Sequence, residues 1–248
     1  VTLLIPLKES DDEFRLTYIS RGMLSTSELS ILQADKEILA FAHRTIKMFG
    51  ISKSLFYAKN ADEAAKIYER VEKYEGISDR MEVEIAKYLT KAAEGRLSNV
   101  SKKNVHALLR VVSEIESIGD SNFNLAKTIM RKRNDGKEYT PEMTKRVEDM
   151  FVLVEEALSE MMHVLNENMT DMTVGSINNS LRIEKDINAL RNEYRMMNAT
   201  DVKEQKYPYE VSVTYMDMIG ECEKIGDYIL NVVEQYQETR AEHKVQEL

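Results

Sequence analysis

The stretch "EIESIGDSNFNLAK", residues Glu114–Lys127, carries a Gly-Asp pair in the middle of a helical pattern. Glycine inside a helix costs about 0.5–1 kcal/mol relative to alanine, so its position calls for a reason. The same pair returns in "ECEKIGDYILNVVE", residues Glu221–Glu234, again with Glu before it and Asn after it. This recurrence predicts an internal repeat in which each copy ends on an equivalent helix.

The composition indicates an all-α protein. The 248 residues include no Trp, three Pro and nine Gly, which favours helices over turns and sheets. The net charge of −9 excludes nucleic acid as a partner, because such a surface repels phosphate backbones. Cys222 is the only cysteine and indicates a reducing compartment. No apolar run reaches the roughly 18–20 residues that a membrane span needs.

Breakers and capping residues divide the chain into six long helical segments, in two sets of three. A Thr-Pro pair at residues 140–141 provides a cap followed by proline at the first helical position. Gly50 is a candidate break within the first segment, and either Ser98 or Ser101 caps the third. The predicted helices cover residues 27–59, 61–94, 98–134, 141–168, 176–200 and 208–240. The corresponding domains are a linker or docking segment (1–24), two repeats (25–136 and 137–240) and a tail (241–248).

A row of carboxylates lies one position along from each glycine. Gly119 falls in the apolar stripe of its helix, so it is expected to face a packing seam where two helix backbones approach closely. Glu116 and Asp120 are four residues apart, as are Glu223 and Asp227 in the second copy. Residues four apart are neighbours on a helix surface. Each pair is therefore expected at the edge of its helix bundle.

The second predicted helix carries a similar row, Glu72, Glu75, Asp79 and Glu82. Antiparallel packing is expected to bring Glu75 and Asp79 against the carboxylates of the third helix. Such a group is costly unless cations or protons compensate its charge. Oxygen ligands suit Mg, Ca, Mn and Fe, with Zn as a further candidate. The alternative is an ordinary solvated acidic face, and the four histidines share no spacing that indicates a metal site.

Three motifs resemble the PhoU family over about residues 27–240. "IESIGDSNFNLAK" and "CEKIGDYILNVVE" resemble the signature of the family's final helix, and "YEGISDRMEVEIAKYL" resembles its E-xxx-D motif on the middle helix. The resemblance implies two three-helix bundles related by pseudo-symmetry, with multinuclear metal sites at the E-xxx-D rows. It also implies a regulatory role in phosphate handling rather than catalysis.

The family's metal-binding positions transfer differently to the two repeats. All four match in the first repeat, namely Glu75, Asp79, Glu116 and Asp120. In the second repeat Glu223 and Asp227 match, and Glu184 stands in the place of Glu75. There Asn188 replaces Asp79 and Arg191 replaces Glu82, which lowers the negative charge. We therefore expect the first site to bind metal more tightly than the second.

The opening segment "RLTYISRGMLSTSELSILQADKEI" is similar to the one that follows the membrane region of bacterial Na/phosphate cotransporter-like proteins. This similarity implies a regulatory domain on the cytoplasmic side of the inner membrane, excised from a longer chain as a soluble piece. Its partner is then a membrane transporter domain, and assembly into a homo-oligomer stays open. The alternative is a free-standing PhoU-type regulator. A di-iron enzyme is disfavoured because such bundles take a Glu-x-x-His motif from each of two helices, and the chain has this spacing once, at Glu160 and His163.

Overall fold

Six long helices make up the regular structure of the part of the chain that the computed structural model describes, residues 16–19, 27–95, 97–166 and 174–246. All regular elements in these ranges are α-helical, as the composition predicted. None of the described helices is long and apolar enough to cross a membrane. The helices are α1 (Ser27–Phe56), α2 (Ala61–Ala93), α3 (Asn99–Asn134), α4 (Pro141–Asn166), α5 (Val174–Lys203) and α6 (Tyr209–Gln246).

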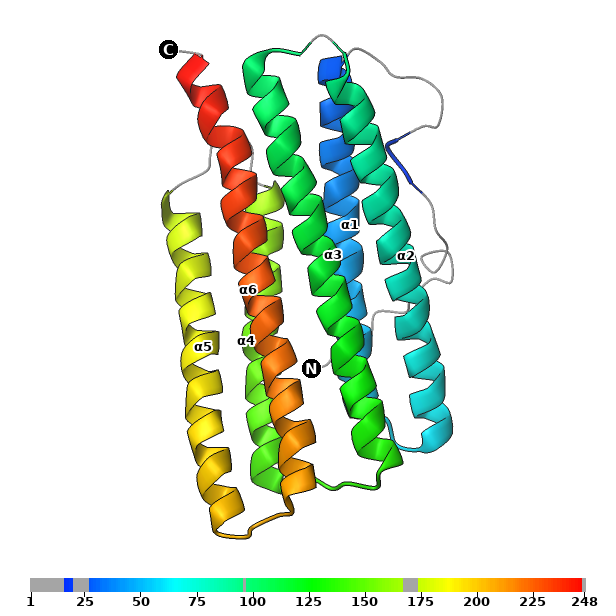
Figure 1. Ribbon diagram of the computed structural model, residues 1–248, viewed down its shortest axis with the longest axis vertical. Helices are drawn as coiled ribbons and strands as arrows, with labels where there is room; N and C mark the ends of the chain where they lie inside the picture. The colour runs from blue at the N-terminus through cyan, green and yellow to red at the C-terminus, as the bar shows by residue number, and fades with distance from the viewer. Residues whose placement is uncertain (1–15, 20–26, 96, 167–173, 247–248) are drawn as a thin grey trace.

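The helices form two bundles of three, α1–α3 (repeat 1) and α4–α6 (repeat 2), as predicted. Figure 1 shows α3 and α6 side by side at the centre, with α2 and α5 on the outer flanks and α1 and α4 behind them. The most extensive helix pairing in the molecule is that between α3 and α6, and α1 also meets α4. The two helices that carry the repeated Gly-Asp pair therefore join the repeats.

Side-chain caps fix the starts of three helices at the predicted places. The backbone N–H of Glu63 donates to Asn60 Oδ1 at 2.9 Å at the start of α2. Ser98, rather than Ser101, caps α3, since its Oγ accepts from the Ser101 N–H at 3.0 Å. Thr140 Oγ1 accepts from the N–H of the third residue of α4 at 3.2 Å. Each cap satisfies a donor that the helix itself leaves unpaired.

Three predicted boundaries are wrong. The first helix continues through Gly50 and ends at Phe56, so this glycine is not a break. Helix α5 extends to Lys203, beyond the expected end at residue 200. Helix α6 continues to Gln246, into the expected tail, because no proline or glycine follows Arg240 to end it. The expected linker, residues 1–24, lies outside the described residues except for 16–19.

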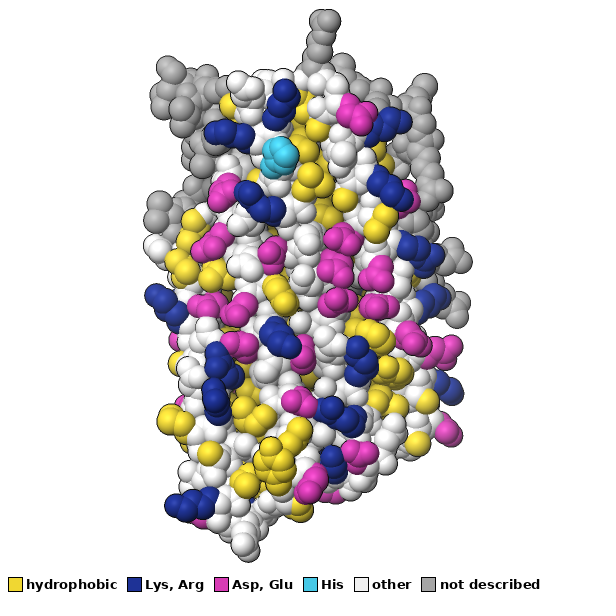
Figure 2. All heavy atoms as spheres, viewed as in Figure 1, with side chains coloured by type: hydrophobic (Ala, Val, Ile, Leu, Met, Phe, Trp, Pro, Cys, Tyr) yellow, Lys and Arg dark blue, Asp and Glu magenta, His cyan; other side chains and the backbone are white. Residues whose placement is uncertain are grey.

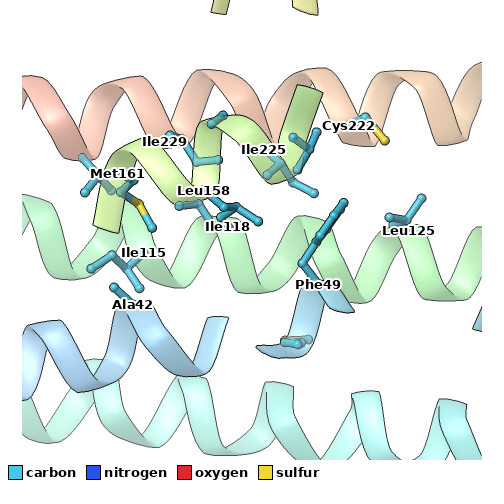
Figure 3. Close-up of a cluster of buried hydrophobic side chains, with 14 of the residues drawn as sticks. Ala42, Phe49, Ile115, Ile118, Leu125, Leu158, Met161, Cys222, Ile225 and Ile229 are labelled. Atoms are coloured by element: carbon cyan, nitrogen blue, oxygen red, sulfur yellow. The ribbon is translucent and has the colours of Figure 1, made fainter. Parts of the chain in front are cut away.

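A shared apolar core binds the two repeats together. Figure 3 shows side chains of α1, α3, α4 and α6 converging on the seam between the bundles. Phe49 of α1 meets Phe151 of α4 edge to face, with ring centroids 5.9 Å apart. Ile118 and Ile225, the residues just before the two glycines, are both fully buried. Burial of this much apolar surface stabilises the pairing of the repeats.

Polar contacts between the repeats fix how the central helices align. Asn231 of α6 donates to Glu114 of α3 at 3.0 Å. One turn away on α3, Arg110 pairs with Glu238 at 2.6 Å, and near the other end of the same interface Arg131 pairs with Asp217. The position of α3, which also carries the predicted metal ligands, is thus set from both sides.

Candidate metal centre

Three of the four predicted repeat 1 ligands meet across α2 and α3. Glu75, Asp79 and Asp120 each offer a carboxylate oxygen, and these oxygens all lie within 4.8 Å of one another. Glu75 and Asp79 are one turn apart on α2, while Asp120 reaches them from α3. Figure 2 shows a group of acidic side chains over these two helices, about half-way along them. The antiparallel packing inferred from the sequence therefore brings the two rows together.

Glu116 and Glu82 complete this group, which we name cluster 1 (Glu75, Asp79, Glu82, Glu116 and Asp120). Partial burial, the charges of Asp120, Glu82 and Asp79, and a hydrogen bond with Asp120 raise the pKa of Glu116 to about 7. Burial followed by the charges of Asp79 and Asp120 also raises the pKa of Glu82. The carboxyls of Glu82 and Glu116 are therefore both destabilised in their ionised forms by the nearby charges of Asp79 and Asp120.

The negative charge of cluster 1 is only weakly compensated by the protein itself. Burial, then the charges of Asp79 and Asp120, raise the pKa of Glu75, and Lys127 opposes them. Lys127 is exposed and lies over the Phe123 ring, 4.5 Å from its centroid. This exposed ammonium opposes the negative charge at Glu75. A hard cation with oxygen ligands fits this donor set, because it supplies the missing positive charge.

The glycine before Asp120 faces α2, where Ser78 is its neighbour. A Cβ on Gly119 would lie 3.4 Å from Ser78 Oγ and 3.6 Å from Ser78 Cβ. The sequence predicted that Gly119 would meet the backbone of a neighbouring helix. This is wrong in detail, because its nearest neighbour is the side chain of Ser78. Ser78 directly precedes Asp79, just as Gly119 directly precedes Asp120. The contact between Ser78 and Gly119 therefore places Asp79 beside Asp120.

Repeat 2 has the same arrangement with different chemistry. Gly226 faces Ile187 of α5, the counterpart of Ser78, which confirms the register in which the two repeats were aligned. The corresponding group, cluster 2, consists of Glu184, Asn188, Arg191, Glu223 and Asp227. Arg191 donates to Glu223 at 2.6 Å and to Asn188 Oδ1 at 3.2 Å, and the Asn188 amide donates to Glu184. The protein thus supplies its own cation here.

Asp227 still feels the negative charge of its neighbours in cluster 2. Burial and the charges of Glu223 and Glu184 raise its pKa to about 6, although Arg191 acts in the opposite direction. The guanidinium occupies the side of the cluster where repeat 1 has Glu82. Cluster 2 therefore carries less uncompensated negative charge than cluster 1, and the weaker second metal site expected from the sequence stays a prediction.

The structure adds Glu82 to the carboxylates of cluster 1, and it places Asn231 in a contact outside both clusters. Glu82 belongs to the acidic row of the sequence but is not among the predicted ligands, and its place one turn beyond Asp79 is the signal that points to it. Asn231 continues the row of Asp227 in sequence, yet it contacts Glu114 of the other repeat. Among the described residues, the exposed His43, His106 and His163 do not join the carboxylate group.

Comparison with known families identifies the architecture. The PhoU domain family matches residues 38–129 and 147–236, one match in each repeat. The chain belongs to the PhoU family. Both clusters lie within the matched ranges. No significant match was found among functionally characterised proteins by sequence.

Solved PhoU structures share this fold. PhoU from Pseudomonas aeruginosa superposes with a TM-score of 0.75 at 14% identity, covering 86% of this chain and 97% of its own. The phosphate transport system regulatory protein PhoU from Streptococcus pneumoniae gives a TM-score of 0.70 at 15% identity, covering 86% and 96%. The PhoU fold is therefore present over nearly the whole chain, with little sequence in common.

Proposed function

We propose that this chain is a cytoplasmic PhoU-like regulatory domain of a sodium-coupled phosphate transporter, which binds metal ions at its E-xxx-D motifs. The observation that carries the proposal is the meeting of Glu75, Asp79 and Asp120 within 4.8 Å in a PhoU-family chain. The Streptococcus pneumoniae neighbour is a phosphate transport system regulatory protein, and this supports the link to phosphate.

In this proposal cluster 1 is the principal metal site. Glu75 and Asp79 hold the cation from α2, and Glu116 and Asp120 hold it from α3. Bound metal supplies the positive charge that lets these carboxylates stay ionised side by side. Because α3 also forms the main interface with α6, the ligands and the joint between repeats share one helix. Regulation, rather than catalysis, is the role that such a site suits.

The proposed partner is a membrane transporter domain in the same full-length chain, on the cytoplasmic side of the inner membrane. The segment "RLTYISRGML" that leads into α1 supports this placement through its similarity to cotransporter-like proteins. The alternative is a free-standing PhoU-type regulator of phosphate uptake and signalling, which the PhoU family match supports equally. The full reading frame discriminates between them, since membrane-spanning segments upstream of Val1 support only the first.

Phosphate uptake measured with the full reading frame tests the function. Asp79→Asn with Asp120→Asn removes two charges from cluster 1. Glu69→Gln with Glu234→Gln removes two charges from exposed positions outside both clusters. We expect the first pair to lower bound metal and to alter how sodium-dependent uptake responds to external phosphate, and the second pair to change neither. Unchanged metal content and unchanged uptake control in the cluster variant would reject the proposal.

A further inference from the structure

A groove of about 950 Å³ runs between α1 and α4, the pair of helices behind α3 and α6 in Figure 1. Its lining includes apolar side chains from both helices, among them Leu39 and Ile46 of α1 and Leu158 and Met162 of α4. Leu158 is buried, whereas the other three are half-buried. The groove therefore offers apolar surface to a chain segment.

Basic side chains follow one edge of this groove. Lys36, His43, Arg44 and Lys47 all line it and fall on one face of α1. Among the described lining residues the single carboxylate is Glu155, and Lys53 neutralises it at 2.7 Å. A basic groove stands out on a chain with a net charge of −9. Its charge favours an acidic occupant.

The chain itself enters this groove at residues 16–19. The N–H groups of Thr17, Tyr18 and Ile19 donate to the Glu37 carboxylate at 2.9, 2.7 and 3.3 Å. Glu37 is fully buried and Ile19 is 8% exposed, so this anchor is part of the folded core. Thr17 and Tyr18 also line the groove. The chain that precedes Leu16 is therefore joined to a segment held at the edge of the groove.

We propose that the acidic segment Glu9–Phe14, "ESDDEF", docks in the groove between α1 and α4, with its carboxylates toward the basic edge and Phe14 on the apolar surface. Four of its six residues are acidic. The groove follows α1 from Lys36 to Gly50, about 21 Å at the helical rise. Residues 9–16 span about 26 Å when extended, which is enough to follow it. This docking does not depend on the proposed function.

Tethering favours this occupant over an acidic segment of another protein. A segment joined by a short linker has an effective concentration in the millimolar range. The anchor at Glu37 shortens the linker to a few residues and fixes where it begins. Displacing the segment therefore requires a competitor that binds the groove much more tightly or a change that neutralises the segment's charge.

Disulfide trapping in the full 248-residue chain tests the docking. Asp12→Cys with His43→Cys places one thiol in the segment and one in the groove. The control pair is Asp12→Cys with Lys185→Cys, which uses an exposed position on α5. Cys222 does not compete in either protein, because it is fully buried and burial raises the pKa of its thiol. We expect intramolecular cross-linking at least about ten-fold faster in the groove pair, from the gain in effective concentration.

Charge reversal distinguishes docking from mere proximity. Lys36→Glu with Lys47→Glu should slow trapping toward the control rate, and adding Asp11→Lys with Glu13→Lys should restore it. Circular dichroism checks that each variant keeps its helices. Equal rates in the two cysteine pairs, or failure of the charge swap to restore trapping in a folded variant, would overturn the proposal. Cross-links between two chains would also overturn it, by assigning the groove to a second copy.

Discussion

Arg191 of α5 donates a hydrogen bond to Glu223 of α6 at 2.6 Å, at the place where repeat 1 sets Glu82 beside Glu116. The same position thus holds an ion pair in one repeat and two like charges in the other. Both partners of the ion pair are mostly buried, with side-chain exposures of 27% and 19%. The repeats therefore keep one geometry and differ in how they balance its charge.

Arg191→Glu should convert cluster 2 into a likeness of cluster 1. The change removes a hydrogen bond between charged groups, worth about 1.5–3 kcal/mol, and adds a carboxylate beside Glu223. We expect a lower melting temperature in chelator and a larger rise on addition of Mn²⁺ or Mg²⁺ than in the parent protein. Lys185→Glu, an equal charge change on exposed α5, is the control. An equal response of both variants would show that Arg191 does not stand in for a cation.

The two glycines should respond differently to alanine. A Cβ on Gly119 would be in ordinary contact with Ser78 Oγ at 3.4 Å, so the helix-propensity gain of about 0.5–1 kcal/mol should make Gly119→Ala neutral or stabilising. A Cβ on Gly226 would lie 2.9 Å from Ile187 Cδ1, so this side chain must shift and Gly226→Ala should be the less stable variant. Urea unfolding of both variants measures the difference.

Ile187→Val isolates the cause, because it removes the Cδ1 atom that the new Cβ would meet. Gly226→Ala should therefore cost less in the Ile187→Val background than alone. A double-mutant cycle gives this coupling directly. Strictly additive effects of the two substitutions would show that the close contact does not limit alanine at Gly226.

The sequence predicted the helices and the E-xxx-D residues because both are properties of a single helix. Periodicity places Glu116 and Asp120 on one face, and caps such as Thr140 mark a helix start. Neither property says which neighbouring helix a face meets. Asn231 lies in the acidic row of α6 by spacing, but the packing of α3 on α6 turns it toward Glu114.

Contacts between helices explain the other differences. The position of Glu82 one turn beyond Asp79 is visible in the sequence, but its nearness to Asp120 comes from the crossing of α2 and α3, which no single-helix pattern fixes. The anchor of residues 17–19 on buried Glu37 joins segments eighteen to twenty residues apart. A lone Glu in a helical stripe gives no sign of such a role, so the sequence could not predict it.

Asp201 should stabilise the end of repeat 2 in a pH-dependent way. Hydrogen bonds from Lys206 at 2.7 Å and Arg146 at 3.0 Å lower the pKa of this carboxyl, which is 7% exposed. A lowered pKa contributes stability that is present above the unfolded value of about 3.9 and is lost as the pH falls through the folded value. Asp201→Asn should cost about 1–3 kcal/mol at pH 7.

That cost should shrink as the pH falls below about 4, because the unfolded parent chain then takes up a proton at this carboxyl, which the folded protein takes up only at lower pH. Urea unfolding of the parent and Asp201→Asn between pH 3 and pH 7 measures it. Glu69→Gln, at an exposed position on α2, is the control and should show little difference at any pH. A cost that stays constant over this range would mean that the charge of Asp201 is not what stabilises the fold.

Neutralising cluster 1 should separate metal binding from stability. Asp79→Asn with Asp120→Asn removes two charges from a group in which like charges already raise the pKa of Glu75 and Asp79. Without metal, the repulsion falls, so the melting temperature should stay level or rise. With metal, fewer ligand charges remain. Stabilisation by a bound ion grows with its concentration relative to Kd, about 2.7 kcal/mol at 100 times Kd, so the thermal shift should shrink.

The matched variant is Glu184→Gln with Asp227→Asn, which removes two charges from cluster 2. Since Arg191 already balances that group, we expect this pair to lower bound metal less than the cluster 1 pair does. Elemental analysis of the purified proteins, and melting curves with chelator and with added Mn²⁺ or Mg²⁺, give both quantities. Equal metal content in the parent and the cluster 1 variant, with an unchanged thermal shift, would mean that the carboxylates of α2 and α3 are a solvated acidic surface. A larger loss in the cluster 2 variant would reverse the order of the two sites, and charge balance would then not decide where metal binds.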